Sequence, residues 1–182
     1  MAYIGLARPV IATYHTEGGK TSYSGGIRFG KAVRIEITPT YEDVSDYGDI
    51  NDDDEEWECT GAEVTLGISM IPEAAENAVN GHTLSENEVL SNCKDRASPL
   101  GIGVRTRESI DGQTKYVAIW LHNVKVTEEG QSHETRGDSI TYTTPSVKGN
   151  ARPDENGDWR TKKTFGTKEE ADAWLDGKAG IE

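Results

Sequence analysis

A run near the N-terminus has the residue types, and part of the spacing, of a phosphate-binding loop. Gly18-Gly19-Lys20-Thr21 matches the end of a P-loop, whose backbone amides and lysine hold phosphate groups. The complete motif has another glycine five residues before Gly19, where this chain has Tyr14, and a helix follows it. Because Ser-Tyr-Ser-Gly-Gly follows here, we interpret the run as a hairpin turn instead.

Carboxylates gather in one segment, which we interpret as an acidic loop over residues 41–61. Its ten acids, with no lysine or arginine among them, are Glu42, Asp43, Asp46, Asp49, Asp52, Asp53, Asp54, Glu55, Glu56 and Glu58. Loops longer than about 12–15 residues in a compact domain are usually functional or disordered. The segment is therefore the first candidate for a functional surface.

The acids of this loop match a calcium-binding EF-hand loop only in part. Residues near the ligand positions are Asp43, Ser45, Gly48, Ile50 and Asp54. However, a tyrosine occupies one ligand position, an aspartate replaces the usual bidentate glutamate, and no flanking helices are expected. We predict no metal site, and interpret the loop as solvated or interface-forming, with a summed field that attracts cations.

Residue types that carry catalysis show no recognisable arrangement. The four histidines have no metal-ligand spacing with one another or with the two cysteines, so no zinc site is expected. We interpret His122, on an expected strand, as a strand-surface or packed imidazole. No Gly-x-Ser-x-Gly motif occurs, although a Ser-His-Asp triad assembled from distant positions stays open. We predict no catalytic residue and no cofactor.

The tryptophans could in principle form a sugar-binding platform. Trp120 and Trp174 lie at apolar positions of an expected strand and helix, which favours the core for both. Trp57 lies inside the acidic loop, and we expect it to be exposed or to be buried only by a partner.

The overall charge limits the possible partners. The 182 residues include 19 lysines and arginines and 32 acids, which gives a net charge of −13. Without the ten acids of residues 42–58, 22 acids would remain and the net charge would be −3. Such a chain disfavours a broad phosphate-binding surface. The sequence predicts no signal peptide, no membrane span, a reducing compartment, and one domain over residues 1–182.

The elements that must position these residues are mostly strands. Residues 31–38 alternate, with Val33, Ile35 and Ile37 on one face, which predicts a half-buried strand. Residues 114–126 are apolar on both faces near their centre, which predicts a central strand covered on two sides. Further strands are expected over residues 9–14, 62–70, 100–106, 139–144 and 159–165, with a hairpin turn at Asp111-Gly112.

Two short helices complete the expected elements. Residues 72–80 begin at a proline and are followed by Gly81. The second helix is predicted over residues 167–177. It begins at Thr167, which forms a capping box with Glu170, and it ends at Gly177. The fold predicted is mainly β (α+β). It is an antiparallel β-sandwich or barrel with one flanking helix, a short C-terminal helix and the long acidic loop between two strands.

Several short segments follow one another along the chain in a distinctive order and spacing. In the second half they are KYVAIWL (115–121), VKV (124–126), ETRGDSI (134–140), TTPSVKG (143–149), WRTKKTF (159–165), EEA (169–171) and AWL (173–175). In the first half they are GLA (5–7), GKA (30–32) and GAEVTLG (61–67). Together these segments resemble the major tail protein family of long-tailed, non-contractile bacteriophages and related prophages, over nearly the whole chain.

The resemblance implies a structural virion protein, the subunit of a phage tail tube, and no enzyme. Such subunits are β-sandwiches that assemble into hexameric rings, which stack into a hollow tube. The implied partners are further copies of the chain, the tape-measure protein, the tail terminator and the tail-tip or distal tail proteins. DNA passes through the lumen without specific binding, and we expect a net-negative wall to repel it. The implied location is the virion tail, and the host cytoplasm during assembly.

We expect the acidic loop to act as the assembly surface and to become ordered on assembly. The expected interface residues are Tyr41, Tyr47, Ile50, Asp52, Asp53, Asp54 and Trp57. Ordering costs about 1–2 kcal/mol per residue, so the loop must gain a large contact surface. Since like-charged loops repel, basic residues on the receiving surface or bound cations must offset the repulsion.

Two other classes of function stay open at this point. The first is a free-standing β-sandwich that binds a ligand such as a carbohydrate through exposed aromatic residues. The second is a hydrolase with a dispersed triad, which no sequence feature favours.

Overall fold

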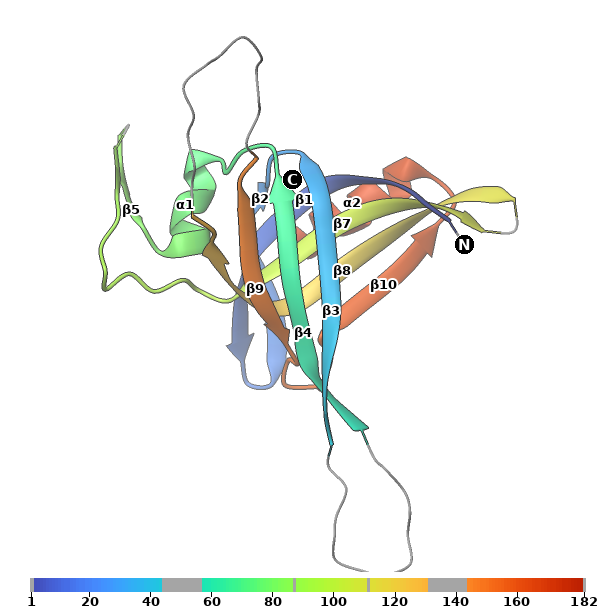
Figure 1. Ribbon diagram of the computed structural model, residues 1–182, viewed down its shortest axis with the longest axis horizontal. Helices are drawn as coiled ribbons and strands as arrows, with labels where there is room; N and C mark the ends of the chain where they lie inside the picture. Colours follow the sequence, from blue (N-terminus) through green and yellow to red (C-terminus); the bar gives the residue numbers. More distant parts are fainter. Residues whose placement is uncertain (1, 44–56, 87, 111, 131–143, 182) are drawn as a thin grey trace, which may run out of the picture.

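The computed structural model describes residues 2–43, 57–86, 88–110, 112–130 and 144–181 (Figure 1). The strands are β1 (Ala2–Glu17), β2 (Lys20–Arg28), β3 (Ala32–Asp43), β4 (Trp57–Ile68), β5 (Thr83–Ser85), β6 (Glu88–Leu90), β7 (Leu100–Ile110), β8 (Gln113–Glu128), β9 (Ser146–Arg152) and β10 (Arg160–Phe165). The helices are α1 (Glu73–Asn80) and α2 (Lys168–Ala179). Eight strands form one antiparallel sheet in the order β2-β1-β7-β8-β9-β4-β3, with β10 paired to β8. The predicted mainly-β antiparallel fold is confirmed.

Strand β8 divides this sheet into two layers. One of its edges pairs with β7, while the other pairs first with β10, over Tyr116–Leu121, and then with β9, over Asn123–Glu128. His122 lies at the change of partner, and its amide donates to the Trp159 carbonyl at 3.0 Å. In Figure 1 the β9-β4-β3 layer lies in front of the β1-β7-β8 layer, and α2 lies behind both. The result is an open sandwich.

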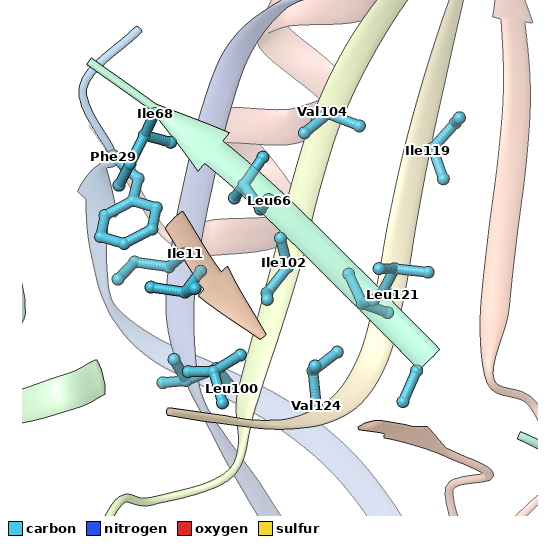
Figure 2. Close-up of a cluster of buried hydrophobic side chains, with 14 of the residues drawn as sticks. Ile11, Phe29, Leu66, Ile68, Leu100, Ile102, Val104, Ile119, Leu121 and Val124 are labelled. Carbon is cyan, nitrogen blue, oxygen red and sulfur yellow. The ribbon is translucent and has the colours of Figure 1, made fainter. Parts of the chain in front are cut away.

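The main core fills the space between the two layers (Figure 2). Leu66 and Ile68 of β4 face Ile102 and Val104 of β7, and all four are at most 1% exposed. The strands predicted over residues 62–70 and 100–106 are therefore confirmed; burial alternates along β4, whereas β7 is buried on both faces from Leu100 to Thr106. A second cluster lies beneath α2, where Trp120 of β8 is fully buried. Strand β8 is thus covered on both faces, as predicted.

The edge strand β3 departs from the expected alternation at one position. Val33 is 56% exposed, whereas Ile35 and Ile37 pack against the core. The pairing register with β4 shifts between Ala32 and Arg34, which takes Val33 out of the buried row.

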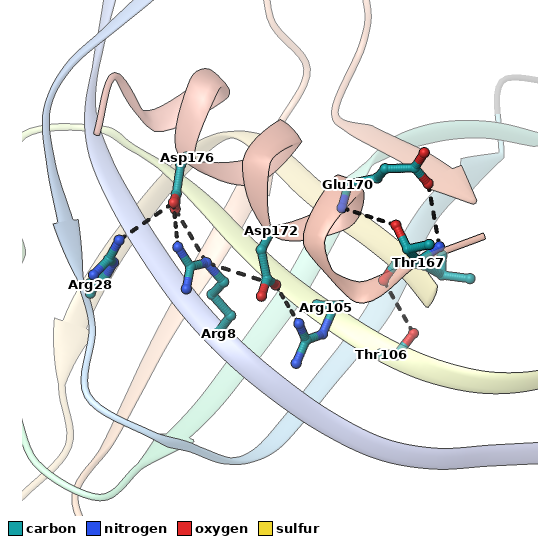
Figure 3. Close-up of polar contacts among 9 residues, drawn as sticks. Arg8, Arg28, Arg105, Thr106, Thr167, Glu170, Asp172 and Asp176 are labelled. Atoms are coloured by element: carbon teal, nitrogen blue, oxygen red, sulfur yellow. Dashed lines mark hydrogen bonds and ion pairs between the residues drawn. The ribbon is translucent and has the colours of Figure 1, made fainter. Parts of the chain in front are cut away.

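The helix boundaries agree with the capping signals, with one correction. Helix α1 ends at Gly81 in the left-handed conformation, and α2 begins with the predicted Thr167–Glu170 capping box (Figure 3). The prediction that α2 ends at Gly177 is wrong. The helix continues to Ala179, because the left-handed cap residue is Gly180 (φ 69°).

Four strands were not predicted: β2, β5, β6 and β9. The Gly18-Gly19 run is the turn of the β1–β2 hairpin, as expected, with both glycines at positive φ. Of the strand expected over residues 139–144, all but Thr144 lie outside the described residues, and Thr144 precedes β9. In the part of the chain that the structure describes, no helix is long and apolar enough to cross a membrane.

Candidate functional site

The ends of β3 and β4 extend past the rest of the sheet as a two-stranded arm. We define this arm by residues 41–43 of β3 and 57–60 of β4. Strand β9 pairs with β4 only from Ala62 onward, so within the described residues the two strands of the arm pair only with each other. Figure 1 shows the arm projecting away from the sandwich.

Gly61 lies where the arm leaves the sheet. Its φ is +146°, and a Cβ atom there would lie 2.3 Å from the Ala151 carbonyl oxygen. The β3–β4 register shifts between Thr40 and Tyr41, directly opposite this residue. Only glycine fits such a close approach at positive φ, so Gly61 fixes the direction in which the arm leaves.

Two aromatic residues of the arm are exposed on one face. Tyr41 is 54% exposed and Trp57 is 60% exposed. Tyr41 pairs with Cys59, and Trp57 pairs with Asp43, so the two aromatic residues are diagonal neighbours on the same face. The prediction that Trp57 is exposed in the free chain is confirmed.

The arm has little to stabilise it in the isolated chain. A two-stranded hairpin without a covered face is marginally stable in water. Glu42 and Glu58 lie directly opposite each other, and like charges in that position destabilise a strand pair. A surface that covers Tyr41 and Trp57 would therefore stabilise the arm.

The predicted bounds of the acidic loop, 41–61, are wrong at both ends. Strand pairing continues through Tyr41, Glu42 and Asp43 and resumes at Trp57. Of the seven expected interface residues, Tyr41 and Trp57 lie on the arm. The other five lie outside the described residues: Tyr47, Ile50, Asp52, Asp53 and Asp54.

A hydrogen-bonded chain of Asp154, His122 and Thr161 has the form of a catalytic triad. His122 Nδ1 lies 3.0 Å from Asp154 Oδ2, and His122 Nε2 lies 2.7 Å from Thr161 Oγ1. Such a chain can activate a hydroxyl group where a substrate reaches it. Here the side chains of His122 and Asp154 are only 10% and 3% exposed, and the cavities of the described surface are lined by other residues. We therefore interpret these hydrogen bonds as structural, and call Asp154, His122 and Thr161 the structural lock.

Asp154 is the centre of this lock. Burial alone would raise its pKa, but the amides of Asn156 and Asp158 donate to its Oδ1 at 2.9 and 3.0 Å. With the bond from His122, these donors hold the pKa of the Asp154 carboxyl below its usual range. Of the two interpretations of His122, a strand-surface or a packed imidazole, the structure shows the packed one, and its two partners were not predicted.

Ion pairs fasten α2 to the sheet (Figure 3). Asp172 pairs with Arg105, whose side chain is 10% exposed. Asp176 pairs with Arg8, whose Nε lies 3.3 Å from Oδ1, and with Arg28 at 3.5 Å. Three cations from three strands thus meet two carboxylates of one helix. Charge at single positions gave no signal of this network, because the partners are far apart in sequence.

Among the described residues, no three His, Cys, Asp or Glu side chains come together so as to hold a metal ion. Cys59 and Cys93 are free thiols. The prediction of no metal, cofactor or catalytic site stays a prediction.

No protein-family model matches this chain, and a search of curated proteins finds no match. The resemblance to major tail proteins therefore stays an expectation drawn from the residues.

Proposed function

We propose that this protein is the subunit of a phage tail tube, a structural virion protein that assembles through stacked hexameric rings into a hollow conduit for DNA. Its location is the virion tail, after assembly in the host cytoplasm. Its partners are its own copies, the tape-measure protein, the tail terminator and the tail-tip proteins. The function is mechanical and includes no catalytic step.

The observation that carries this proposal is the β3–β4 arm. It extends the pairing of two strands beyond the sheet and presents Tyr41 and Trp57 to solvent. The same arm leads into the most acidic segment of the chain. Exposed aromatic residues on a projecting, marginally stable hairpin are typical of a surface that a second molecule covers.

The free strand edges supply a way to close a ring. Among the described residues, β2, β3 and β10 each pair with a single strand. An unpaired edge offers a row of backbone donors and acceptors to another chain. A head-to-tail contact between two different edges closes into a ring when the rotation per subunit permits it.

The described cavities give no support to the carbohydrate-binding alternative. A sugar platform needs aromatic rings that line a hollow, whereas the linings of these cavities include no tryptophan, tyrosine or phenylalanine. The exposed Tyr41 and Trp57 lie instead on the narrow arm.

Sedimentation velocity and negative-stain electron microscopy of the full chain test the proposal. At increasing protein concentration we expect rings and tubes. Trp57→Ser, which removes the exposed anchor, should raise the concentration needed for tubes by roughly tenfold, about 1.4 kcal/mol. Leu84→Ser is the control, because Leu84 is also an exposed apolar residue but lies on β5, away from the arm.

A deletion extends this test. Removal of residues 47–56 should leave a β-rich monomer, checked by circular dichroism, that forms no tubes. Normal tubes from the deleted chain would refute a role of residues 47–56 in assembly. A wild-type chain that stays monomeric at all concentrations and binds a sugar would refute the proposed function.

A further inference from the structure

A groove opens between the two layers of the sandwich, where the edge strands β3 and β10 are not paired with each other within the described residues. Its volume is about 670 Å³. Leu6, Ile35 and Ile37, which pack against the main core, and Ile119 form its apolar lining. The groove is therefore an open side of the hydrophobic core.

The charged residues of this groove are all cations. They are Arg34, Arg160 and Lys162, and its lining includes no carboxylate. Arg34 pairs with Glu36 outside the groove, and the Arg160 guanidinium lies 4.4 Å from the centre of the Trp159 ring. The three cations outnumber the two carboxylates that adjoin the lining, Glu36 and the buried Glu108, which accepts from Thr106 at 3.0 Å.

The other described cavities lack this combination. Two lie on the outer face of β3, β4 and β9, with polar linings in which Glu63 accompanies the cations. The third lies beside α2, where the arginines are already paired with the carboxylates of that helix. Of these described cavities, the β3–β10 groove alone has both an apolar surface and cations without a carboxylate in its lining.

The segment 41–58 has the complementary composition. It carries ten acids and no base, and its apolar residues are Tyr41, Val44, Tyr47, Ile50 and Trp57. Tyr41 and Trp57, at the base of this segment, are exposed within their own chain. Opposite charges steer the two surfaces together, and burial of the aromatic residues then stabilises the contact.

We propose that the β3–β10 groove receives residues 41–58 of a second copy of this chain. The groove lies beside the first residues of β3, and the arm is at the last ones. From Ile37 to Asp43 the strand spans roughly 20 Å, at about 3.3 Å per residue. In Figure 1 the arm points away from β10, so an arm that fills the groove has to come from another copy.

This inference rests on the proposed self-assembly, and it adds that the contact between copies is head-to-tail. Donor and receptor surfaces lie at opposite ends of one strand, so the contact is heterologous and repeats from copy to copy. The cations of the groove are then the basic residues that offset the repulsion between acidic segments.

A labelled peptide of residues 41–58, titrated with the full-length protein, tests the groove without any need for tubes. Fluorescence anisotropy should show saturable binding at low salt that weakens as salt is raised. Arg160→Glu with Lys162→Glu should weaken binding by roughly tenfold or more. Lys125→Glu with Arg152→Glu makes the same change in net charge on the outer sheet face, and should leave affinity within about twofold. Circular dichroism and thermal unfolding check that both variants are folded.

A second peptide separates a specific contact from simple charge attraction. It keeps all ten acids but replaces Tyr41, Tyr47, Ile50 and Trp57 by serine, and it should bind roughly tenfold more weakly or not at all. Equal binding of the two peptides, equal loss in both protein variants, or no binding to the wild-type chain would overturn the proposed groove contact.

These outcomes are distinguishable from failure of the proposed function. If tubes form and reversal of the groove cations changes neither tubes nor peptide binding, the groove is wrong and the tail-tube proposal stands. If the peptide binds in the groove but the full chain never forms rings or tubes, the contact stands and the tail-tube proposal is wrong.

Discussion

Asp154 and its neighbour Glu155 join their turn to two other parts of the chain, β8 and the β1–β2 hairpin. It accepts hydrogen bonds from its own turn, at Asn156 and Asp158, and from His122 of β8. Thr16 of β1 donates to the neighbouring Glu155 at 2.6 Å, which attaches the same turn to the β1–β2 hairpin. The side chain that resembles part of a catalytic triad therefore holds the turn before β10 against the sheet.

Asp154→Asn should reduce stability in a pH-dependent way. Because the folded-state pKa of Asp154 lies below its ordinary value of about 3.9, its contribution is complete above that pH and is lost as the pH falls through the folded-state pKa. We expect the variant to lose about 1–3 kcal/mol of unfolding free energy near pH 7 and less near pH 3, measured by denaturant titration across this range.

Asp158→Asn is the matched control, because this exposed residue bonds to Asp154 through its backbone amide and carbonyl, which the substitution keeps. It should leave the unfolding free energy nearly unchanged at every pH. A stability difference for Asp154→Asn that stays constant from pH 7 to pH 3 would contradict the role given to the ionised carboxylate.

At the scale of elements, two glycines of β7 allow α2 to pack on the sheet. A Cβ atom at Gly101 would lie 2.4 Å from Trp120 Cζ2, and one at Gly103 would lie 2.7 Å from Trp120 Cε3 and 2.8 Å from Leu175 Cδ2. The missing side chains leave a slot that the indole of Trp120 fills beneath the helix. Helix α2 and strands β7 and β8 thus fit together through the smallest residue type.

Gly103→Ala should overpack this slot. We expect a loss of about 1–3 kcal/mol, which corresponds to a fall of roughly 2–4 °C in Tm for each kcal/mol. Gly177→Ala is the control, since Gly177 is an exposed residue inside α2 with no atom near its Cβ position, and it should gain about 0.5–1 kcal/mol. Differential scanning calorimetry of both variants checks the pair; equal effects of the same sign would contradict the slot.

The sequence predicted the strands in which the pattern of apolar residues matches the pattern of buried residues. Strand β4 alternates cleanly, and β8 is apolar on both faces because it lies between the main core and α2. Strand β9 was missed because its core residues are only Val147 and Ala151, so its pairing with β4 and β8 decides its conformation.

The candidate site was predictable in part for the same reason. An aromatic residue among acids, as at Trp57, indicates an exposed or partner-covered position. The continuation of the β3–β4 ladder through Glu42 and Glu58 was not predictable, because acids have low strand propensity and the ladder is set by pairing. The groove is lined by residues of both β3 and β10, which are far apart in sequence and come together only in the folded chain.

At the scale of the whole molecule, the negative charge is unevenly placed. Residues 42–58 carry ten of the 32 acids. The outer face of β3, β4, β9 and the end of β8 has no helix over it in Figure 1, and it is mixed in charge. Its charged residues include the cations Arg34, Lys125, Lys148 and Arg152 and the acids Glu36, Glu63 and Glu129. Lys148 lies 2.6 Å from Glu129, which lowers the pKa of that carboxyl and raises that of the lysine.

This balance leads to a prediction about DNA. The wild-type chain should show no measurable binding to double-stranded DNA in a filter or gel-shift assay, even at low salt. Acids accompany the cations on the uncovered face, and the net charge of the whole chain is −13. Glu36→Lys with Glu63→Lys turns that face basic and should create binding that weakens steeply as salt is raised. Asp53→Lys with Asp54→Lys gives the same net charge without a basic sheet face, and should create none. If the wild-type chain binds DNA as well as the Glu36→Lys/Glu63→Lys variant does, the acids on this face do not prevent adhesion, and a conduit that lets DNA slide would need another explanation.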